Sequence, residues 1–198
     1  MSAAFLAGVA AGYGIAMPVG AIAVLVAGLS ARTSLRIGAA AGLGAATADG
    51  VYALVAVAGG AALAGVVTPY ATPLRVLAAA VLLGLAGHTA VSALRRRDAP
   101  ATERARPVTA RGAYAGILGL TLLNPATVVY FAALVLGRGG TGGGWWFVAG
   151  AFLASASWQL LIAGGGSLVG RLLTGERGRL VTALVSSVVI AVLAVRLL

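Results

Sequence analysis

The chain of 198 residues contains no cysteine, no lysine and a single histidine, His88. The absence of cysteine excludes disulfides, thiolate metal sites and dithiol redox chemistry, and one histidine is too few for a histidine-rich metal site. A nucleophile paired with a base, or a cluster of metal ligands, is equally hard to assemble from these residues. We therefore expect neither an enzyme nor a bound cofactor.

Charge is scarce as well, since charged residues make up 9% of the chain and hydrophobic residues 61%. A soluble domain of this size could not bury so much apolar surface, whereas a helical bundle in lipid needs no polar outer face. The net charge of +10 could indicate a nucleic-acid-binding protein, but the arginines lie between apolar segments. We expect an integral membrane protein in contact with lipids, with no nucleic-acid partner.

Six apolar segments have the length that spans a hydrocarbon core of about 30 Å. They cover residues 5–29, 37–62, 74–94, 112–136, 145–169 and 179–198. No basic region precedes the first segment, which is too long for the core of a signal peptide, so we expect a retained helix. The predicted fold class is all-α, with one polytopic transmembrane domain, residues 1–198, of six helices.

The arginines are divided unevenly between the two sides of such a domain. The first, third and fifth connections carry two, six and three of them, and the opposite side carries three. The positive-inside rule then places the central linker, residues 95–111, in the cytoplasm and both termini outside. Arginine without lysine, together with abundant glycine and alanine, suggests a bacterial genome, so we expect a bacterial inner membrane protein.

Asp49 is the one charged residue in the apolar stretch 37–67. Counting about 1.5 Å per residue from Arg36, it lies ~20 Å along the helix, close to the membrane midplane. A central Asp costs roughly 2.5 to 3.5 kcal/mol on insertion scales, so such residues usually face a bundle interior or a water-filled path. The carboxylate can pair with a cationic substrate group or take up a proton. The alternative is a structural Asp, hydrogen-bonded to Tyr, Thr or Asn across the bundle.

Pro18 and Pro125 each interrupt an apolar segment. Each removes a backbone donor and frees a carbonyl at membrane depth, which is tolerated where that carbonyl faces a cavity. Overlaying the two prolines relates the first three helices to the last three, and an odd number of helices per repeat makes the halves inverted. We predict repeats at about 1–94 and 112–198, with a site between the two breaks, beside Asn124. Ordinary proline kinks and an interhelical hydrogen bond of Asn124 are the alternatives.

Three short motifs follow one another along the chain. Residues 17–21 read Met-Pro-Val-Gly-Ala, residues 42–52 form a glycine-rich stretch that ends in Asp-Gly-Val-Tyr, and residues 123–126 read Leu-Asn-Pro-Ala. In this order, with six helices and a charged central loop, they resemble the lysine exporter (LysE/RhtB) family of amino-acid exporters. The resemblance spans nearly the whole chain. It implies a secondary transporter that exports amino acids or related small metabolites against an inward flow of protons.

The residues that we assign to substrate binding or proton coupling are Asp49, Pro18, Gly20, Asn124, Pro125 and Tyr52. Tyr52 follows Asp49 by three residues, so it could hydrogen-bond the carboxylate or stack on a substrate, although simple packing explains it equally well. Weaker candidates are Tyr13, Tyr130 and Gln159.

The chain departs from the family pattern at two positions. Ala21 stands where a second proline is frequent, and Ala126 stands where a lysine often follows Asn-Pro. The lost cation could have paired with a substrate carboxylate, so the resemblance does not identify the substrate. A metal-cation exporter that uses Asp49 and backbone carbonyls, or a non-transporting assembly protein, are the alternatives.

Small residues recur at the four-residue spacing that permits close helix packing. The pairs are Gly8 with Gly12, Gly38 with Gly42, and Gly112 with Gly116. They are compatible with contacts inside one subunit or between subunits, so a homo-oligomer is left open.

Overall fold

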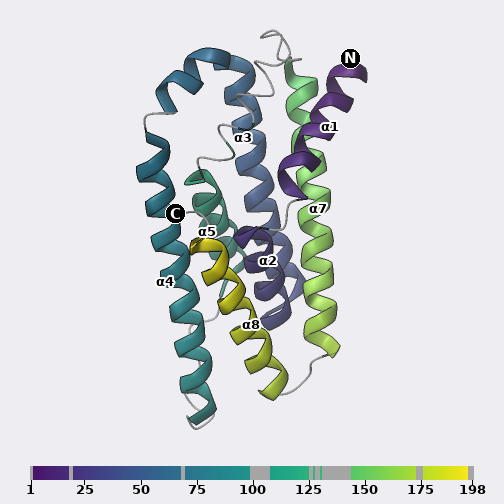
Figure 1. Ribbon diagram of the computed structural model, residues 1–198. Coiled ribbons are helices and arrows are strands. Elements are labelled where there is room, and N and C mark those ends of the chain that lie inside the picture. The colour runs from purple at the N-terminus through teal and green to yellow at the C-terminus, as the bar shows by residue number, and fades with distance from the viewer. Residues whose placement is uncertain are drawn as a thin grey trace.

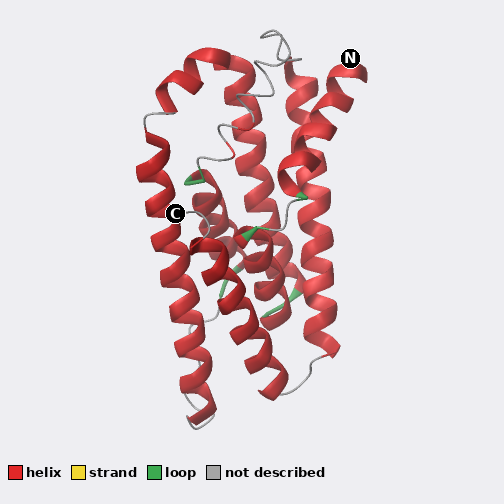
Figure 2. Cartoon of the chain, viewed as in Figure 1, coloured by secondary structure: helices red, strands yellow, loops and turns green. Residues whose placement is uncertain are grey.

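The computed structural model describes residues 2–17, 20–67, 70–98, 108–124, 127, 130, 144–172 and 176–195. Within these ranges the chain is helical and contains no strand (Figure 1 and Figure 2). The helices are α1 (Ser2–Ala16), α2 (Ala21–Arg32), α3 (Leu35–Val67), α4 (Ala71–Asp98), α5 (Ala110–Leu122), α7 (Gly144–Leu172) and α8 (Glu176–Val195). The predicted all-α class is confirmed.

Several helix ends lie beyond the predicted apolar segments. α3 continues through apolar residues as far as Val67. α4 extends to Asp98 and therefore includes Arg95, so the helix continues into the predicted linker 95–111. Arginine is a good helix former, and a cation near a helix C-terminus interacts favourably with the helix dipole. α8 begins at Glu176, an acidic residue suited to the first turn of a helix.

Two of these helices are long and apolar enough to cross a membrane, at Leu35–Gly59 within α3 and Gly144–Gly170 within α7. α1 and α2 form a third candidate if the pair counts as one span, bent by 78° at the break after Ala16. The C-terminal ends of α4 and α7 lie at the lower end of the bundle in Figure 1, and the N-terminus lies at the upper end. The arginine-rich end of α4 is thus on the same side as the end of α7.

α7 is the central packing partner of the bundle. It packs against α1, α2 and α3, while α3 also packs against α5, and α4 pairs with α8. A Cβ at Gly8 or Gly12 of α1 would collide with the backbone of α7, and one at Gly38 would collide with Ser30. These glycines therefore lie at helix contacts, as predicted. Gly116 does not, because open space surrounds it among the described residues.

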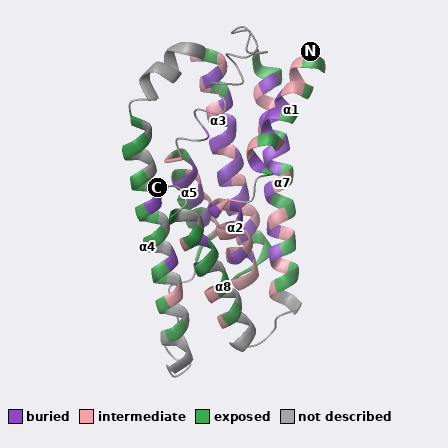
Figure 3. Cartoon of the chain, in the orientation of Figure 1, coloured by how far each residue is buried: buried purple, intermediate pink, exposed green. Residues whose placement is uncertain are grey.

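The buried interior consists mainly of small side chains. Most of the buried apolar residues are alanines, and the largest fully buried side chains are Phe147, Ile190 and Val26. Leucines and valines such as Leu161 and Val188, by contrast, are more than half exposed on the outside of α7 and α8. Figure 3 shows buried residues along the middle of the bundle and exposed residues on the outer helices. Small residues inside and branched apolar residues outside are typical of helices packed in lipid.

Candidate functional site

Asp49 lies in the middle of the membrane-spanning part of α3. It is about 21 Å from Leu35 and about 15 Å from Gly59 along the helix axis. The side chain is 4% exposed, so α3 directs it into the bundle and away from lipid. Burial at this depth is the position that the sequence predicted for a functional carboxylate.

The partner of Asp49 is Ser155 on α7. The Ser155 Oγ donates a hydrogen bond of 2.6 Å to Asp49 Oδ2, and Ser155 is completely buried. This hydrogen bond ties one oxygen of the buried carboxylate to α7.

Glycines of α3 set the distance between α3 and α7 around this pair. A Cβ at Gly42 would lie 3.0 Å from the Cβ of Gln159, and one at Gly50 would lie 3.2 Å from the ring of Phe152. Both separations are tighter than ordinary van der Waals contact, so a larger residue at either position would push the helices apart. The close approach allows a short serine side chain to reach the carboxylate.

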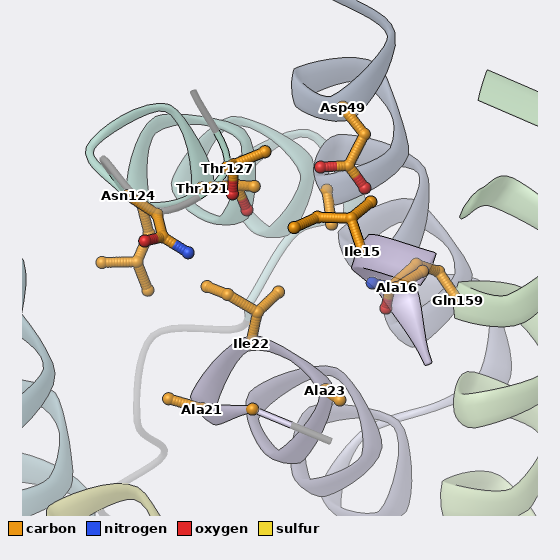
Figure 4. A pocket seen from close by; sticks show the side chains of 13 residues that line it. Ile15, Ala16, Ala21, Ile22, Ala23, Asp49, Thr121, Asn124, Thr127 and Gln159 are labelled. Carbon is orange, nitrogen blue, oxygen red and sulfur yellow. The ribbon is translucent and has the colours of Figure 1, made fainter. Parts of the chain in front are cut away.

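A cavity of about 170 Å³ opens beside Asp49 (Figure 4). Its wall combines residues of α1, α2, α3, α5 and α7 with Gly20, which precedes α2, and two residues that follow α5. The lining residues are Ile15, Ala16, Gly20, Ala21, Ile22, Ala23, Ala45, Asp49, Leu120, Thr121, Asn124, Thr127 and Gln159. For comparison, an engineered protein cavity of about 150 Å³ binds benzene, so this space suits a small molecule.

The break between α1 and α2 forms one side of the cavity. α1 ends at Ala16, and α2 begins after Gly20, which has extended dihedrals and no side chain that could cap the helix. The first N–H groups of an α-helix have no acceptor within the helix, and together they carry the positive end of its dipole. Gly20 therefore lines the cavity, whereas Pro18 lies outside the described residues.

The end of α5 forms the opposite break. The Leu123 N–H donates to the Gly119 and Thr121 carbonyls, and the Asn124 N–H donates to the Thr121 carbonyl. Asn124 follows this turn and lines the cavity. Pro125 and Ala126 lie outside the described residues.

Tyr52 occupies a different place from the one that its spacing suggested. Its hydroxyl donates a hydrogen bond to the Leu122 carbonyl. This is one of the last carbonyls of α5, and such carbonyls receive no hydrogen bond from within the helix. It is not among the residues that line the cavity, and its hydroxyl does not bond the Asp49 carboxylate. Tyr52 therefore ties α3 to the α5 break rather than facing the cavity.

Three polar side chains in the cavity complete the site. Thr121 is buried and donates to the Ile117 carbonyl, and Thr127 is buried as well. Gln159 is 5% exposed, and its Oε1 has no hydrogen-bond partner among the described residues. In the sequence Gln159 is a weaker candidate for the site, and Ser155 and the two threonines are not identified. The spacing of Ser155 and Gln159, four residues apart and hence on one helix face, was the available signal.

The remaining weaker candidates lie beside the cavity rather than in its wall. Tyr13 Oη and Ser157 Oγ are 2.9 Å apart and join α1 to α7. A Cβ at Gly14 would collide with the Tyr130 hydroxyl, so that tyrosine covers α1 just before the break. Both tyrosines fit the alternative interpretation of helix packing.

The chemistry of the cavity follows from its groups. Asp49 is the one charged side chain in the lining, and no basic side chain is among the lining residues. Among the described residues, no three His, Cys, Asp or Glu side chains come together as a metal site would require. The arrangement offers one carboxylate, an amide oxygen, hydroxyls and a helix N-terminus without a side-chain cap to a small polar molecule.

Comparison with known proteins gives one match. A protein-family model, LysE type translocator, matches residues 14–198 and so covers both helix breaks and every helix from the end of α1 onward. No curated protein and no solved structure gives a significant match.

Proposed function

The chain belongs to the LysE type translocator family, and from this premise we propose that it exports amino acids or related small metabolites by antiport with protons. Family membership makes it a membrane transporter. The observation that supports the finer proposal is the cavity at mid-depth, where Asp49 is the one charged side chain in the lining. Carboxylates at this depth commonly take part in substrate or proton pathways.

Asp49 is the group that couples the two fluxes in this proposal. Desolvation favours the neutral acid, whereas a bound cationic group favours the carboxylate. A proton that arrives from the outside binds the carboxylate and displaces the cationic group of the substrate; release of that proton to the cytoplasm restores the binding form. One proton enters for each cationic group that leaves.

Ser155 fits both states of this cycle. A serine hydroxyl can donate one hydrogen bond and accept others. It donates to Asp49 Oδ2 in the structure, and it can accept from the protonated acid after a rotation of the hydroxyl. Asp49 therefore keeps a buried partner whether or not it carries a proton.

We further propose that the protein has six spans in two inverted repeats of three helices. The packing pattern supports this, because α1 and α2 contact α7 much as α5 contacts α3, while α3 pairs with α7 and α4 with α8. The overlay of Pro18 on Pro125 also places Ala48 on Ser155. The axis that relates the halves would then pass close to the hydrogen bond between Ser155 and Asp49.

The proposed orientation places the arginine-rich ends of the helices in the cytoplasm and both termini outside, in a bacterial inner membrane. The C-terminal ends of α4 and α7 lie on one side of the bundle, which supports a common cytoplasmic face (Figure 1). Cysteine accessibility tests this directly, because the chain has no native cysteine. A cysteine that replaces Ser2 should react with an impermeant reagent in intact cells.

Export from loaded proteoliposomes tests the function. Wild type should export one or more amino acids from a panel of the twenty. Export should be faster when the pH is lower outside the loaded compartment than inside it, because protons then enter as the amino acid leaves. Asp49→Asn should lose both this acceleration and at least ~90% of the rate, a loss of about 1.4 kcal/mol or more in transition-state stabilisation. Asp98→Asn, which neutralises a carboxylate at the end of α4, should stay within twofold of wild type.

Each other outcome identifies another function. Unchanged export by Asp49→Asn would remove Asp49 from the mechanism. Movement of divalent cations without any amino acid would favour a metal-cation exporter. Movement of no solute in the panel, by protein that is folded and inserted, would favour a non-transporting assembly protein.

A further inference from the structure

Gln159 contains an acceptor that the structure leaves without a donor. The side chain is 95% buried, its Oε1 has no hydrogen-bond partner in the part of the chain that the structure describes, and it lines the cavity beside Asp49. Figure 4 shows it reaching from α7 toward the space between Asp49 and α2. A buried amide oxygen without a donor is costly, so nearly all such groups in proteins are satisfied by protein, water or ligand.

Gln159 and Asp49 form a pair of acceptors on one wall of the cavity. Ser155 bonds the Asp49 carboxylate, and Gln159 follows Ser155 by four residues, which places the two α7 side chains one helical turn apart on the same face. The backbone of Gln159 is fixed against α3 at Gly42. An ammonium group has three donors, enough to bond both a carboxylate oxygen and an amide oxygen that line one cavity.

Donors lie on the other side of the cavity. Gly20, Ala21 and the next two residues of α2 line it, and the helix begins there without a side-chain cap. Figure 4 shows Asp49 and the first turn of α2 on opposite sides of the space. Free backbone N–H groups and the positive end of the dipole make a helix N-terminus a binding site for carboxylates.

The rest of the wall limits the side chain of a ligand, which is the part besides its ammonium group and its carboxylate. Ile15, Ile22 and Leu120 are apolar, and no second charged side chain is among the lining residues. With Asp49 occupied by one ammonium group, a second cation on the ligand would have no carboxylate to pair with. The wall therefore favours an uncharged, aliphatic side chain.

We propose that the cavity recognises a small zwitterion with an uncharged side chain, through its ammonium group at Asp49 and Gln159 and its carboxylate at the N-terminus of α2. Gln159 is a specificity-determining residue in this site. The inference rests on the proposed export function, and it narrows the substrate to neutral amino acids over basic ones. It also makes a lysine after Asn-Pro unnecessary for binding the carboxylate.

Ligand analogues test the two ends separately in wild-type proteoliposomes. The tracer is the labelled form of the amino acid that wild type exports fastest, and unlabelled compounds compete with its export. The unlabelled amino acid should compete at least ~10-fold better than its methyl ester, which lacks the carboxylate. It should likewise compete at least ~10-fold better than its N-acetyl derivative, which lacks the ammonium group. Lysine should compete at least ~10-fold more weakly than leucine. Equal competition by the ester, or stronger competition by lysine, would overturn the corresponding part of the proposal.

Two variants test the protein side. Gln159→Leu should raise the KM for export about 10-fold or more and should reduce discrimination against the N-acetyl derivative. Trp158→Phe is the matched control, because Trp158 Nε1 is also buried without a partner but the residue does not line the cavity, and its KM should stay within twofold. An unchanged KM for Gln159→Leu would refute its role.

Gly20→Ser tests the helix N-terminus. A serine at this position can cap the free N–H groups in the extended conformation that Gly20 already has, so the variant should fold at least as well as wild type. Discrimination between the amino acid and its methyl ester should fall severalfold, and unchanged discrimination would contradict the carboxylate site.

If wild type exports no amino acid at all, the proposed function fails and this inference fails with it. If wild type and Asp49→Asn behave as proposed but the analogues and variants do not, this inference alone fails.

Discussion

The hydrogen bond between Ser155 and Asp49 should give a measurable coupling energy between substitutions at these two residues, in the middle of the bundle. Ser155→Ala removes the hydrogen bond that α7 donates to the buried carboxylate. A hydrogen bond to a charged group contributes about 1.5 to 3 kcal/mol, and an unpaired buried charged group costs at least as much. We expect Ser155→Ala to lower the free energy of unfolding by about 2 kcal/mol.

A double-mutant cycle isolates that interaction from the loss of packing. Asp49→Leu removes the carboxylate, and the double variant leaves neither partner unpaired, so it should be much less destabilised than the two single effects predict. Reversible unfolding in mixed detergent micelles, followed by circular dichroism, measures all four proteins. The expected coupling energy is about 1.5 kcal/mol or more.

Ser157→Ala provides the matched control in the same helix. The Ser157 hydroxyl bonds the Ala154 carbonyl and Tyr13, not Asp49. Its effect should add to that of Asp49→Leu within about 0.5 kcal/mol, the usual error of additivity for independent sites. A coupling between Ser155 and Asp49 as small as that of this control would refute the assigned hydrogen bond.

Two further predictions concern packing and can be checked by thermal unfolding in detergent. Tyr52→Phe should lower the free energy of unfolding by about 1 kcal/mol, because it leaves the Leu122 carbonyl without this donor. It should leave the KM for export unchanged, because Tyr52 does not line the cavity. A tenfold change in KM would place Tyr52 in the site. Gly12→Ala should destabilise by about 1 kcal/mol or more, because the new methyl group would meet the α7 backbone. Gly116→Ala should be neutral or stabilise by up to ~1 kcal/mol, since a Cβ there would meet no described residue within 4 Å. Equal effects of the two glycine variants would contradict the assigned helix contact.

The sequence predicted the features that depend on depth and composition. An apolar run has a countable length, so the spans of α3 and α7 and the burial of Asp49 followed from about 1.5 Å per residue. Proline and glycine mark helix breaks, so the sequence could also place Gly20 and Asn124 beside such breaks, where both line the cavity. These predictions needed no knowledge of which helix lies beside which.

Partners across the bundle could not be predicted in this way. Ser155 is one of several small polar residues in α7, and only the close contact of α3 with α7 shows that it reaches Asp49. Tyr52 has the spacing of a residue that could bond Asp49, yet the position of α5 gives its hydroxyl a backbone carbonyl instead. Helix-to-helix distances depend on glycine contacts between distant segments, which periodicity along one helix does not encode.

The absence of a cation after Asn-Pro left the sequence without an obvious partner for a substrate carboxylate. In the proposed site that partner is the backbone of α2, because the break after Ala16 starts a new helix at the cavity with no side chain to cap it. A helix N-terminus attracts a carboxylate without the desolvation cost of burying a basic side chain at membrane depth. It also leaves Asp49 without a nearby positive side chain among the lining residues, so the carboxylate stays available to an ammonium group or a proton. Introducing a lysine at Ala126 would therefore be expected to weaken coupling rather than improve it, because its ammonium group would compete with the substrate for the same carboxylate. Export by Ala126→Lys that is faster than wild type and still driven by the proton gradient would show that the site needs the cation that this chain lacks.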